Sequence, residues 1–192
     1  MRAHVIAAAF GMAMILAGEA VADGPWKGKI VDAETGQRLS GAVVLAAWWK
    51  RSPGVVHERT AFYDATEVVT DDEGRFVIPP VKTATLNPFT HIDGPDLKIF
   101  KRGYGQWRFR GEPQLSPSNT LEWERWRATA WKRFTSDGIV IELPALKSKE
   151  DRFRFREVVA PSSLIPPERT PQMTRAIEEE DAWLGIRPAP RH

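Results

Sequence analysis

Two short segments with glycine-containing turns constrain the fold of this 192-residue chain more than any other feature. The first segment is 28–44, with a turn at 33–36, and the second is 70–78, with a turn at 71–74. Each turn ends in a glycine at a point where the chain must reverse, and glycine adopts a positive φ without the strain that a side chain brings. The two segments therefore predict strand edges in a β-rich domain.

The segment 42–50 is apolar on both of the faces that an extended strand presents. One face would carry Val43, Leu45, Ala47 and Trp49, and the other would carry Val44, Ala46 and Trp48. A strand with two apolar faces is usually central in its sheet and covered on both sides. We therefore expect an element beyond a bare two-sheet sandwich to cover the outer face of this strand.

Turn-forming residues divide the rest of the β-rich region. The turn at 71–74 joins two strand-like runs and predicts a hairpin. The segment 81–96 holds three further turn-formers, two prolines and a glycine, and predicts a long loop. The expected strands are 26–32, 42–50, 62–70, 75–78, 97–101 and 139–143.

Particular residues in these segments match a known pattern. They are Gly28, Val31, Asp32, Thr35, Gly36, Leu39, Gly41, Ala42 and Val43, then Thr70, Asp71, Gly74 and Phe76, and finally Gly103 and Tyr104. In order and spacing they resemble the carboxypeptidase-regulatory-like domain family, over about 27–104. The resemblance implies a mainly β fold, a seven-stranded transthyretin-like β-sandwich, and a supporting or binding module without the peptidase zinc site. Arg38 stands where the family pattern usually has proline, which implies a looser turn.

The predicted β-sandwich domain spans 23–146 and contains an insertion at 105–137 that lies outside the family pattern. Aromatic residues recur at helical spacing within this insertion, and they predict an amphipathic helix at 121–134. Asn119 is the expected N-cap of that helix. The insertion therefore adds a helix to the expected sandwich.

A helical C-terminal extension is expected over 147–192. One helix is predicted at 149–158, after a capping Ser148, and a second begins at Thr170 and ends at Gly185. The acidic run Glu178, Glu179, Glu180 and Asp181 is interpreted as a solvated helix face.

The N-terminus has the pattern of an export signal. Arg2 precedes an apolar run at 5–18, and 20–22 has the small-x-small form that signal peptidase accepts. The run is shorter than the roughly 20 residues of a spanning helix, so an uncleaved anchor is the less favoured alternative. We expect a signal peptide at 1–22, cleavage after Ala22, and a periplasmic or secreted protein. The chain has no cysteine, which excludes disulfides, thiolate metal sites and a lipid anchor on cysteine.

The charge of the chain and its histidines bear on which functions are open to it. The formal net charge of +2 argues against a dedicated nucleic-acid binder. The zinc carboxypeptidase pattern His-x-x-Glu is absent, because His57 is followed at once by Glu58 and His91 has Gly94 at the third position. These two histidines with Glu58 and Asp93 could form a metal site, but their spacing is not diagnostic, and surface histidines are the preferred interpretation. We expect no enzyme activity, no cofactor and no metal.

A basic and aromatic stretch is the strongest candidate for function. From 97 to 134 there are nine Lys or Arg against three Glu, and the chain has eight tryptophans in all. Such residues suit stacking on a glycan or contact with an anionic membrane surface. The structural alternative, which we prefer, is that the tryptophans cover the face of the 42–50 strand that Trp48 or Trp49 requires. The candidate ligand-binding residues are Trp107, Arg108, Arg110, Trp123, Trp126 and Arg127.

These observations favour an exported, non-enzymatic β-sandwich module with a binding or structural role in the cell envelope. Its expected partner is an unidentified envelope protein or glycan, and no nucleic acid. One alternative is a peripheral membrane protein, or a glycan- or peptidoglycan-binding protein, that acts through the Trp/Arg-rich helix. Another is an accessory domain protein of a hydrolase system. Metal content and binding to liposomes or glycans distinguish these classes.

Overall fold

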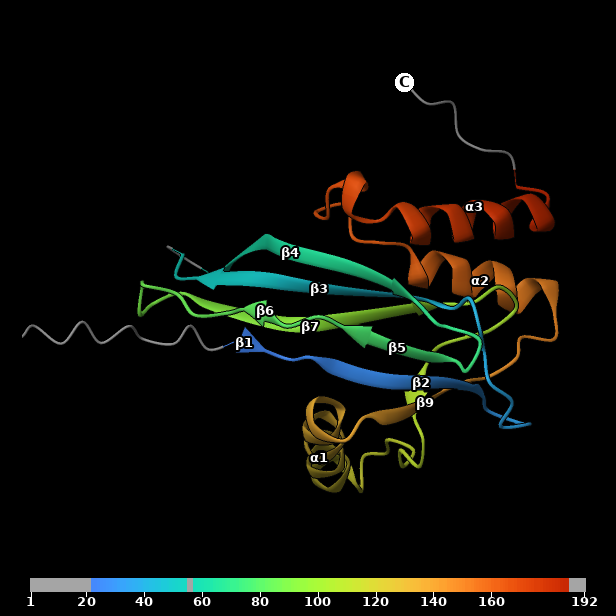
Figure 1. The fold of residues 1–192 in the computed structure, drawn as a ribbon, viewed down its shortest axis with the longest axis horizontal. Helices are drawn as coiled ribbons and strands as arrows, with labels where there is room; N and C mark the ends of the chain where they lie inside the picture. Colours follow the sequence, from blue (N-terminus) through green and yellow to red (C-terminus); the bar gives the residue numbers. More distant parts are fainter. Residues whose placement is uncertain (1–21, 55–56, 187–192) are drawn as a thin grey trace, which may run out of the picture.

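The structure is a computed structural model, and it describes residues 22–54 and 57–186 (Figure 1). Over these residues the fold is mainly β, as expected, with three α-helices. The strands are β1 (Ala22–Asp23), β2 (Trp26–Asp32), β3 (Val43–Ser52), β4 (Arg59–Val69), β5 (Arg75–Ile78), β6 (Val81–Lys82), β7 (His91–Phe100), β8 (Arg108–Phe109) and β9 (Ile139–Leu143). The helices are α1 (Thr120–Ser136), α2 (Lys149–Val159) and α3 (Pro171–Leu184), with a 3₁₀ turn η1 (Pro167–Arg169).

Two larger sheets carry the fold. One has the strand order β5-β2-β9-β8 and the other the order β4-β3-β7, while β1 and β6 form a separate two-stranded ribbon. β9 runs parallel to β2, and the other paired strands are antiparallel. The described strands exceed the seven expected from the family resemblance, so the strand set does not by itself establish a transthyretin-like sandwich.

The two larger sheets pack against each other through one apolar core. Trp26 on β2 and Trp48 on β3 join the sheets, with their ring centroids 5.6 Å apart. Both rings are almost fully buried. The same core takes in Val44 and Ala46 from β3, and Ile30 and Ile141 from the opposite sheet. One face of β3 is therefore covered by the four-stranded sheet.

The second face of β3 confirms the expectation of an additional cover. Leu45 on this face is 1 % exposed and belongs to a separate core with residues from α2, α3 and their connection. Figure 1 shows α2 and α3 beside the three-stranded sheet and α1 on the opposite side of the molecule. The C-terminal helices, and not the insertion, thus cover the face of Trp49. The tryptophans of the insertion that join a core do so on the side of Trp48; they are Trp107, Trp126 and Trp131.

The turn at 71–74 is present, but the predicted hairpin is wrong. Asp71 Oδ1 accepts the backbone N–H of Arg75 at 2.8 Å, which closes the turn. β4 pairs with β3, whereas β5 pairs with β2 in the other sheet. The chain crosses between the sheets here because Phe76 and Ile78 extend the apolar inner face that β2 begins.

β7 begins at His91, inside the segment that was predicted to be a loop. Gly94 and Pro95 lie within this strand, opposite a register shift in β3 at Trp48. A Cβ on Gly94 would lie 2.7 Å from the indole ring of Trp48 and 2.9 Å from the carbonyl oxygen of Ala47. The strand therefore continues through two turn-forming residues, because at a bulge the missing side chain makes room for the ring.

The two glycine-turn segments are bonded to each other. Thr70 Oγ1 donates to the carbonyl oxygen of Leu39 at 2.7 Å and accepts the N–H of Ala42 at 2.8 Å. The N–H of Ile30 donates to the carbonyl oxygen of Gly74 at 2.7 Å. The segments recognised separately in the sequence thus form one connection between the two sheets.

Asp32, at the end of β2, organises the first of these turns. Its Oδ1 accepts the backbone N–H of Thr35 at 2.7 Å and that of Glu34 at 2.8 Å. The hydrogen bond from Thr35 is the main cause that lowers the pKa of Asp32 below its ordinary value of 3.8, and burial opposes it. Burial and the charge of Asp32 in turn raise the pKa of Tyr104.

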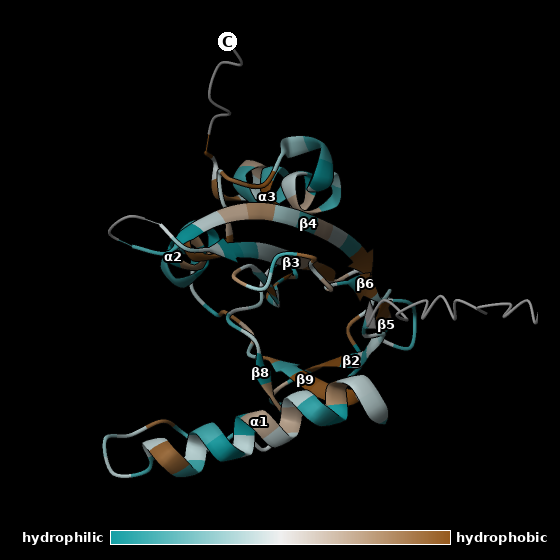
Figure 2. Cartoon of the chain, turned by 90° about the vertical axis from the view of Figure 1, so that its left-hand side faces the viewer, coloured by the Kyte–Doolittle hydropathy of each residue, from teal (hydrophilic) through white to brown (hydrophobic). Residues whose placement is uncertain are grey.

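The predicted helix of the insertion is confirmed as α1, with slightly wider bounds. Phe134 anchors it in the core between the rings of Phe76 and Phe109, at centroid distances of 6.1 and 6.2 Å. Asn119 holds the N-cap position, but its side chain makes no capping bond, because its Oδ1 accepts the N–H of Ser116 instead. Figure 2 shows mixed polar and apolar residues along α1, which lies beside β2 and β9.

The two predicted C-terminal helices are confirmed as α2 and α3. Ser148 caps α2 through a 3.0 Å hydrogen bond, and Gly185 ends α3 with a φ of 83°. Thr170 makes no side-chain capping bond to α3. The carboxylate of Glu67, on β4, takes this role and accepts the N–H of Met173 at 2.8 Å.

The interpretation of the acidic run in α3 as a solvated face is wrong for two of its residues. Glu180 is 2 % exposed and accepts two hydrogen bonds from Arg152, each at 2.5 Å. Asp181 pairs with Arg156 at 2.6 Å. The carboxylates lie on the side of α3 that packs against α2, so they join the two helices.

The predicted signal peptide lies outside the described residues except for Ala22, which pairs with Lys82 in the β1–β6 ribbon. Among the helices of residues 22–54 and 57–186, none combines the length and the apolar character needed to cross a bilayer.

Candidate functional site

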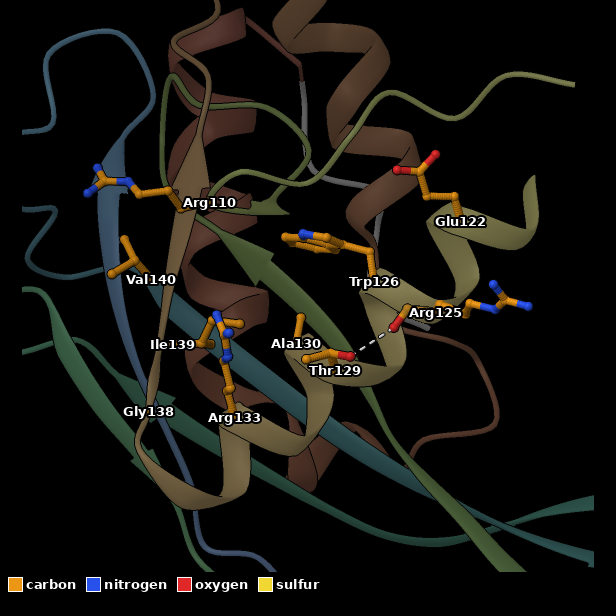
Figure 3. Close-up of a pocket in the computed structure, with 10 residues that line it drawn as sticks. All are labelled: Arg110, Glu122, Arg125, Trp126, Thr129, Ala130, Arg133, Gly138, Ile139 and Val140. Carbon is orange, nitrogen blue, oxygen red and sulfur yellow. Dashed lines mark hydrogen bonds between the residues drawn. The ribbon is translucent and has the colours of Figure 1, made fainter. Parts of the chain in front are cut away.

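A groove with a volume of about 530 Å³ lies between α1 and the strand β9, with Arg110 beyond the end of β8 at its edge, and we call it the α1 groove. Trp126 and Ala130 from α1 and Ile139 and Val140 from β9 form its apolar part. Figure 3 shows the ring of Trp126 directed from the helix toward the strands, with Arg110 on the far side. The indole ring therefore lies across the groove.

The sequence of α1 explains why these side chains share one wall. Trp126, Ala130 and Arg133 are spaced at i, i+4 and i+7, which places them on one helix face. Ala130 is almost fully buried, and its small side chain leaves room beside the strand. The groove therefore results from a small residue between a ring and a guanidinium.

Positive charge dominates the α1 groove. Arg110, Arg125 and Arg133 line it, against one acid, Glu122. Among the described residues, Arg125 and Arg133 have no carboxylate partner within 4 Å. In Figure 3, Arg133 reaches toward Ile139, whereas the Arg125 side chain extends away from the Trp126 ring. Arg133 is therefore the cation best placed to contact a ligand beside the Trp126 ring, while Arg110 lines the groove from the strand side.

Arg127 is the centre of a different cluster. Its guanidinium carbon lies 4.8 Å from the ring centroid of Trp123 and 5.9 Å from those of Trp107 and Phe109. Its Nη1 donates to Glu112 at 3.3 Å. Three aromatic faces and a carboxylate together satisfy this cation. The cluster ties the loop before α1 to the helix and is structural in character.

Arg108 and Arg110 share one carboxylate. Glu142 on β9 is 9 % exposed, and its two oxygens accept from the Nε atoms of Arg108 at 3.3 Å and Arg110 at 2.8 Å. Charge-assisted hydrogen bonds of this kind are stronger than neutral ones. They hold Arg110 at the edge of the α1 groove.

The structure brings two of the six predicted ligand-binding residues, Trp126 and Arg110, into the groove. The other four do not line the groove: Trp107, Trp123 and Arg127 form the cluster described above, and Arg108 shares Glu142 with Arg110. The prediction missed Arg125, Arg133, Ala130 and Val140. The helical spacing from Trp126 to Arg133 was a signal that could have found that arginine.

A second hollow, with a volume of about 370 Å³, lies on the other side of β9, and we call it the sheet hollow. It shares Gly138, Ile139 and Val140 with the α1 groove, so the two adjoin. Its charged lining residues are Lys27, Lys29, Arg75 and Asp137. Like the α1 groove, it carries three cations against one acid.

The residues considered as metal ligands meet only in part. His91 Nε2 lies 3.4 Å from Asp93 and 4.0 Å from Glu58. Arg51 pairs with the same two carboxylates, at 3.1 Å for Asp93 and 3.6 Å for Glu58. A guanidinium therefore lies between the acids, where a metal ion would be expected. Within residues 22–54 and 57–186, no three His, Asp or Glu side chains are grouped to hold a metal.

No family model, curated protein or solved structure matches this chain. The resemblance to the carboxypeptidase-regulatory-like family therefore stays a prediction. The case for function rests on the α1 groove and its surroundings.

Proposed function

We propose that this protein is an exported, non-enzymatic module of the cell envelope that binds an acidic carbohydrate in the α1 groove. For its fold we propose the seven-stranded transthyretin-like sandwich of the carboxypeptidase-regulatory-like family, in which the four-stranded and three-stranded sheets supply the seven strands. The β1–β6 ribbon and the helices are then additions to that core.

The observation that carries this proposal is the ring of Trp126 directed from α1 toward the strands, in a groove that Arg110 and Arg133 also line. The C–H face of a sugar packs on an indole ring, which is large and apolar with a polar edge. A carboxylate or phosphate on the same sugar pairs with a guanidinium through charge-assisted hydrogen bonds. Pockets with a mostly apolar lining and a few polar groups are the usual form of small-ligand sites.

The direction of the tryptophan ring favours a carbohydrate over a membrane surface. Rings that contact a bilayer project outward from a helix to the headgroup level. Trp126 instead faces the strands, and it packs on Phe109 with the ring centroids 6.4 Å apart. The ring is open to a ligand that enters the groove and not to a flat surface.

Titration calorimetry with digalacturonate, a short acidic sugar, tests the proposal. We expect binding at low ionic strength, weakened up to about fivefold by Arg133→Gln, the loss expected for one exposed ion pair. Trp126→Ala should weaken binding further, because it removes the stacking surface. Trp123→Ala, on the same helix but outside the groove, is the matched control.

Absence of digalacturonate binding, or equal affinity in the wild type and Arg133→Gln, overturns the proposal. Trp126 also packs on Phe109, so its variant must first be shown to be folded by circular dichroism. Arg133 is exposed, and its substitution tests the groove even if Trp126→Ala does not fold.

A further inference from the structure

We infer that the α1 groove continues over β9 into the sheet hollow and that the two together bind a linear acidic polysaccharide along a path that crosses the strands. This inference rests on the proposed function, and it specifies the length of the carbohydrate that the protein binds. It depends on the register of the four-stranded sheet and on two cations, Lys29 and Arg75, that have no carboxylate partner among the described residues.

The strand register places three cations in one row. Lys29 on β2 lies directly opposite Arg75 on β5 and, on its other side, Val140 on β9. Arg110, next to β8, donates its backbone N–H to the carbonyl oxygen of Val140 at 2.9 Å. Residues opposite one another on neighbouring strands point to the same face. Arg75, Lys29, Val140 and Arg110 therefore line one path across four strands.

Two of these cations repel each other in the free protein. Like charges directly opposite on paired strands destabilise a sheet, and Lys29 and Arg75 are such a pair. Neither has a carboxylate partner within 4 Å among the described residues. Of the described residues that line the sheet hollow, Asp137 is the single acid. A ligand that places negative groups over this pair removes the repulsion. The Lys29–Arg75 pair is therefore unfavourable for folding but favourable for binding an anionic ligand.

The distance across the row sets the size of the ligand. From β5 to β8 there are three strand spacings, about 14 Å at the usual separation of paired strands. This distance exceeds the length of one sugar ring. Between the two charged ends lies Val140, half-buried, which also lines the α1 groove that Trp126 lines from the helix. Alternation of charge with an apolar surface suits a chain of sugar rings that carry acidic groups.

An affinity series with size-defined oligogalacturonides, from the dimer to the hexamer, tests this extent. We expect affinity to rise with chain length until the ligand spans both hollows. Lys29→Gln and Arg75→Gln should each weaken the hexamer about fivefold, as expected for loss of an exposed ion pair, and leave the dimer unchanged. Arg133→Gln should weaken both. Arg175→Gln, an exposed arginine on α3 outside both hollows, should weaken neither.

Carboxylates and phosphates are both anions that can pair with this row of cations. A second set of titrations therefore uses phosphorylated mannan oligosaccharides. Tighter binding of that set identifies the acidic group as phosphate, and tighter binding of oligogalacturonides identifies it as carboxylate; either supports the path. Neutral cello-oligosaccharides should bind far more weakly than both.

Binding of the dimer with no gain in longer oligomers would overturn the inference while leaving the proposed function intact. If the wild-type protein binds no acidic sugar of any length, both the inference and the proposed function are overturned. Binding to anionic phosphatidylglycerol vesicles, weakened by Lys29→Gln and Arg75→Gln without any oligosaccharide binding, would overturn both in favour of a membrane surface.

Discussion

Glu67, near the end of the three-stranded sheet's edge strand β4, accepts the backbone N–H of Met173 at 2.8 Å in the first turn of α3. The sheet thereby caps a helix more than one hundred residues later in the chain. The first N–H groups of a helix have no partner within the helix. Here Thr170 leaves them unsatisfied, and a strand carboxylate accepts two of them, at Gln172 and Met173.

We expect Glu67→Ala to lower the free energy of unfolding by about 1 kcal/mol, the usual cost of losing a helix cap. The negative charge at the positive end of the helix dipole is lost as well. Urea denaturation monitored by circular dichroism measures the change. Glu124→Ala, which removes an exposed acid from α1, is the control and should have little effect. Equal stability of both variants would show that the cap contributes nothing.

Asp32 should contribute to the pH dependence of stability. Its pKa in the folded protein is lowered, chiefly by the hydrogen bond from the backbone of Thr35. A carboxyl whose folded pKa is depressed stabilises the fold above its unfolded pKa, and this contribution is lost as the pH falls through the folded pKa. Asp32→Asn should therefore flatten the loss of stability below about pH 4. Denaturation midpoints measured from pH 6 down to pH 2.5 check this, and parallel curves for both proteins would contradict it.

Gly94 should be intolerant of a side chain. A Cβ at this position would lie 2.7 Å from the ring of Trp48, and the φ of 140° is also unfavourable for other residues. We expect Gly94→Ala to destabilise the protein by about 2 kcal/mol or more, the cost of overpacking a core. Gly111 has a φ of 77° with no atom within 4 Å of an added Cβ. Gly111→Ala therefore measures the cost of positive φ alone, and thermal unfolding should show a smaller effect than for Gly94→Ala.

Lys29→Gln should stabilise the free protein, in contrast to its effect on ligand binding. Removing one member of the like-charged pair with Arg75 should raise the free energy of unfolding by about 0.5 kcal/mol. The gain should disappear in 1 M salt, where the Debye length is about 3 Å. Urea denaturation at low and high salt, with Arg175→Gln as the charge-matched control, measures this. A variant that is less stable than the wild type at low salt would show that Lys29 has a packing role instead.

Local elements were largely predictable from the sequence. The alternation of 42–50 identified a strand with two buried faces, and the spacing of aromatic residues identified α1. Ser148 and Gly185 marked ends of α2 and α3 correctly. These signals are local, because they depend on side-chain periodicity and on backbone conformations that few residues adopt.

The candidate site was predicted only in part, for a physical reason. Arg127 and Trp126 are neighbours on one helix, but one side chain turns into an aromatic cluster and the other into the α1 groove. Which of two adjacent residues meets a ligand depends on how the helix is rotated against the sheet. The rotation is set by tertiary packing, because it is fixed when Phe134 of α1 packs between Phe76 and Phe109 in the core.

By itself, the sequence determined which segments are strands, where several of the turns lie and which strand needs cover on both faces. Only the tertiary structure decided that β4 and β5 belong to different sheets, that α2 and α3 supply the cover, and that Lys29 faces Arg75. The difference follows from the range of the interactions. Turns and periodicity are set by neighbours in the chain, whereas strand partners and register are set by the burial of apolar faces that meet only after the chain has folded.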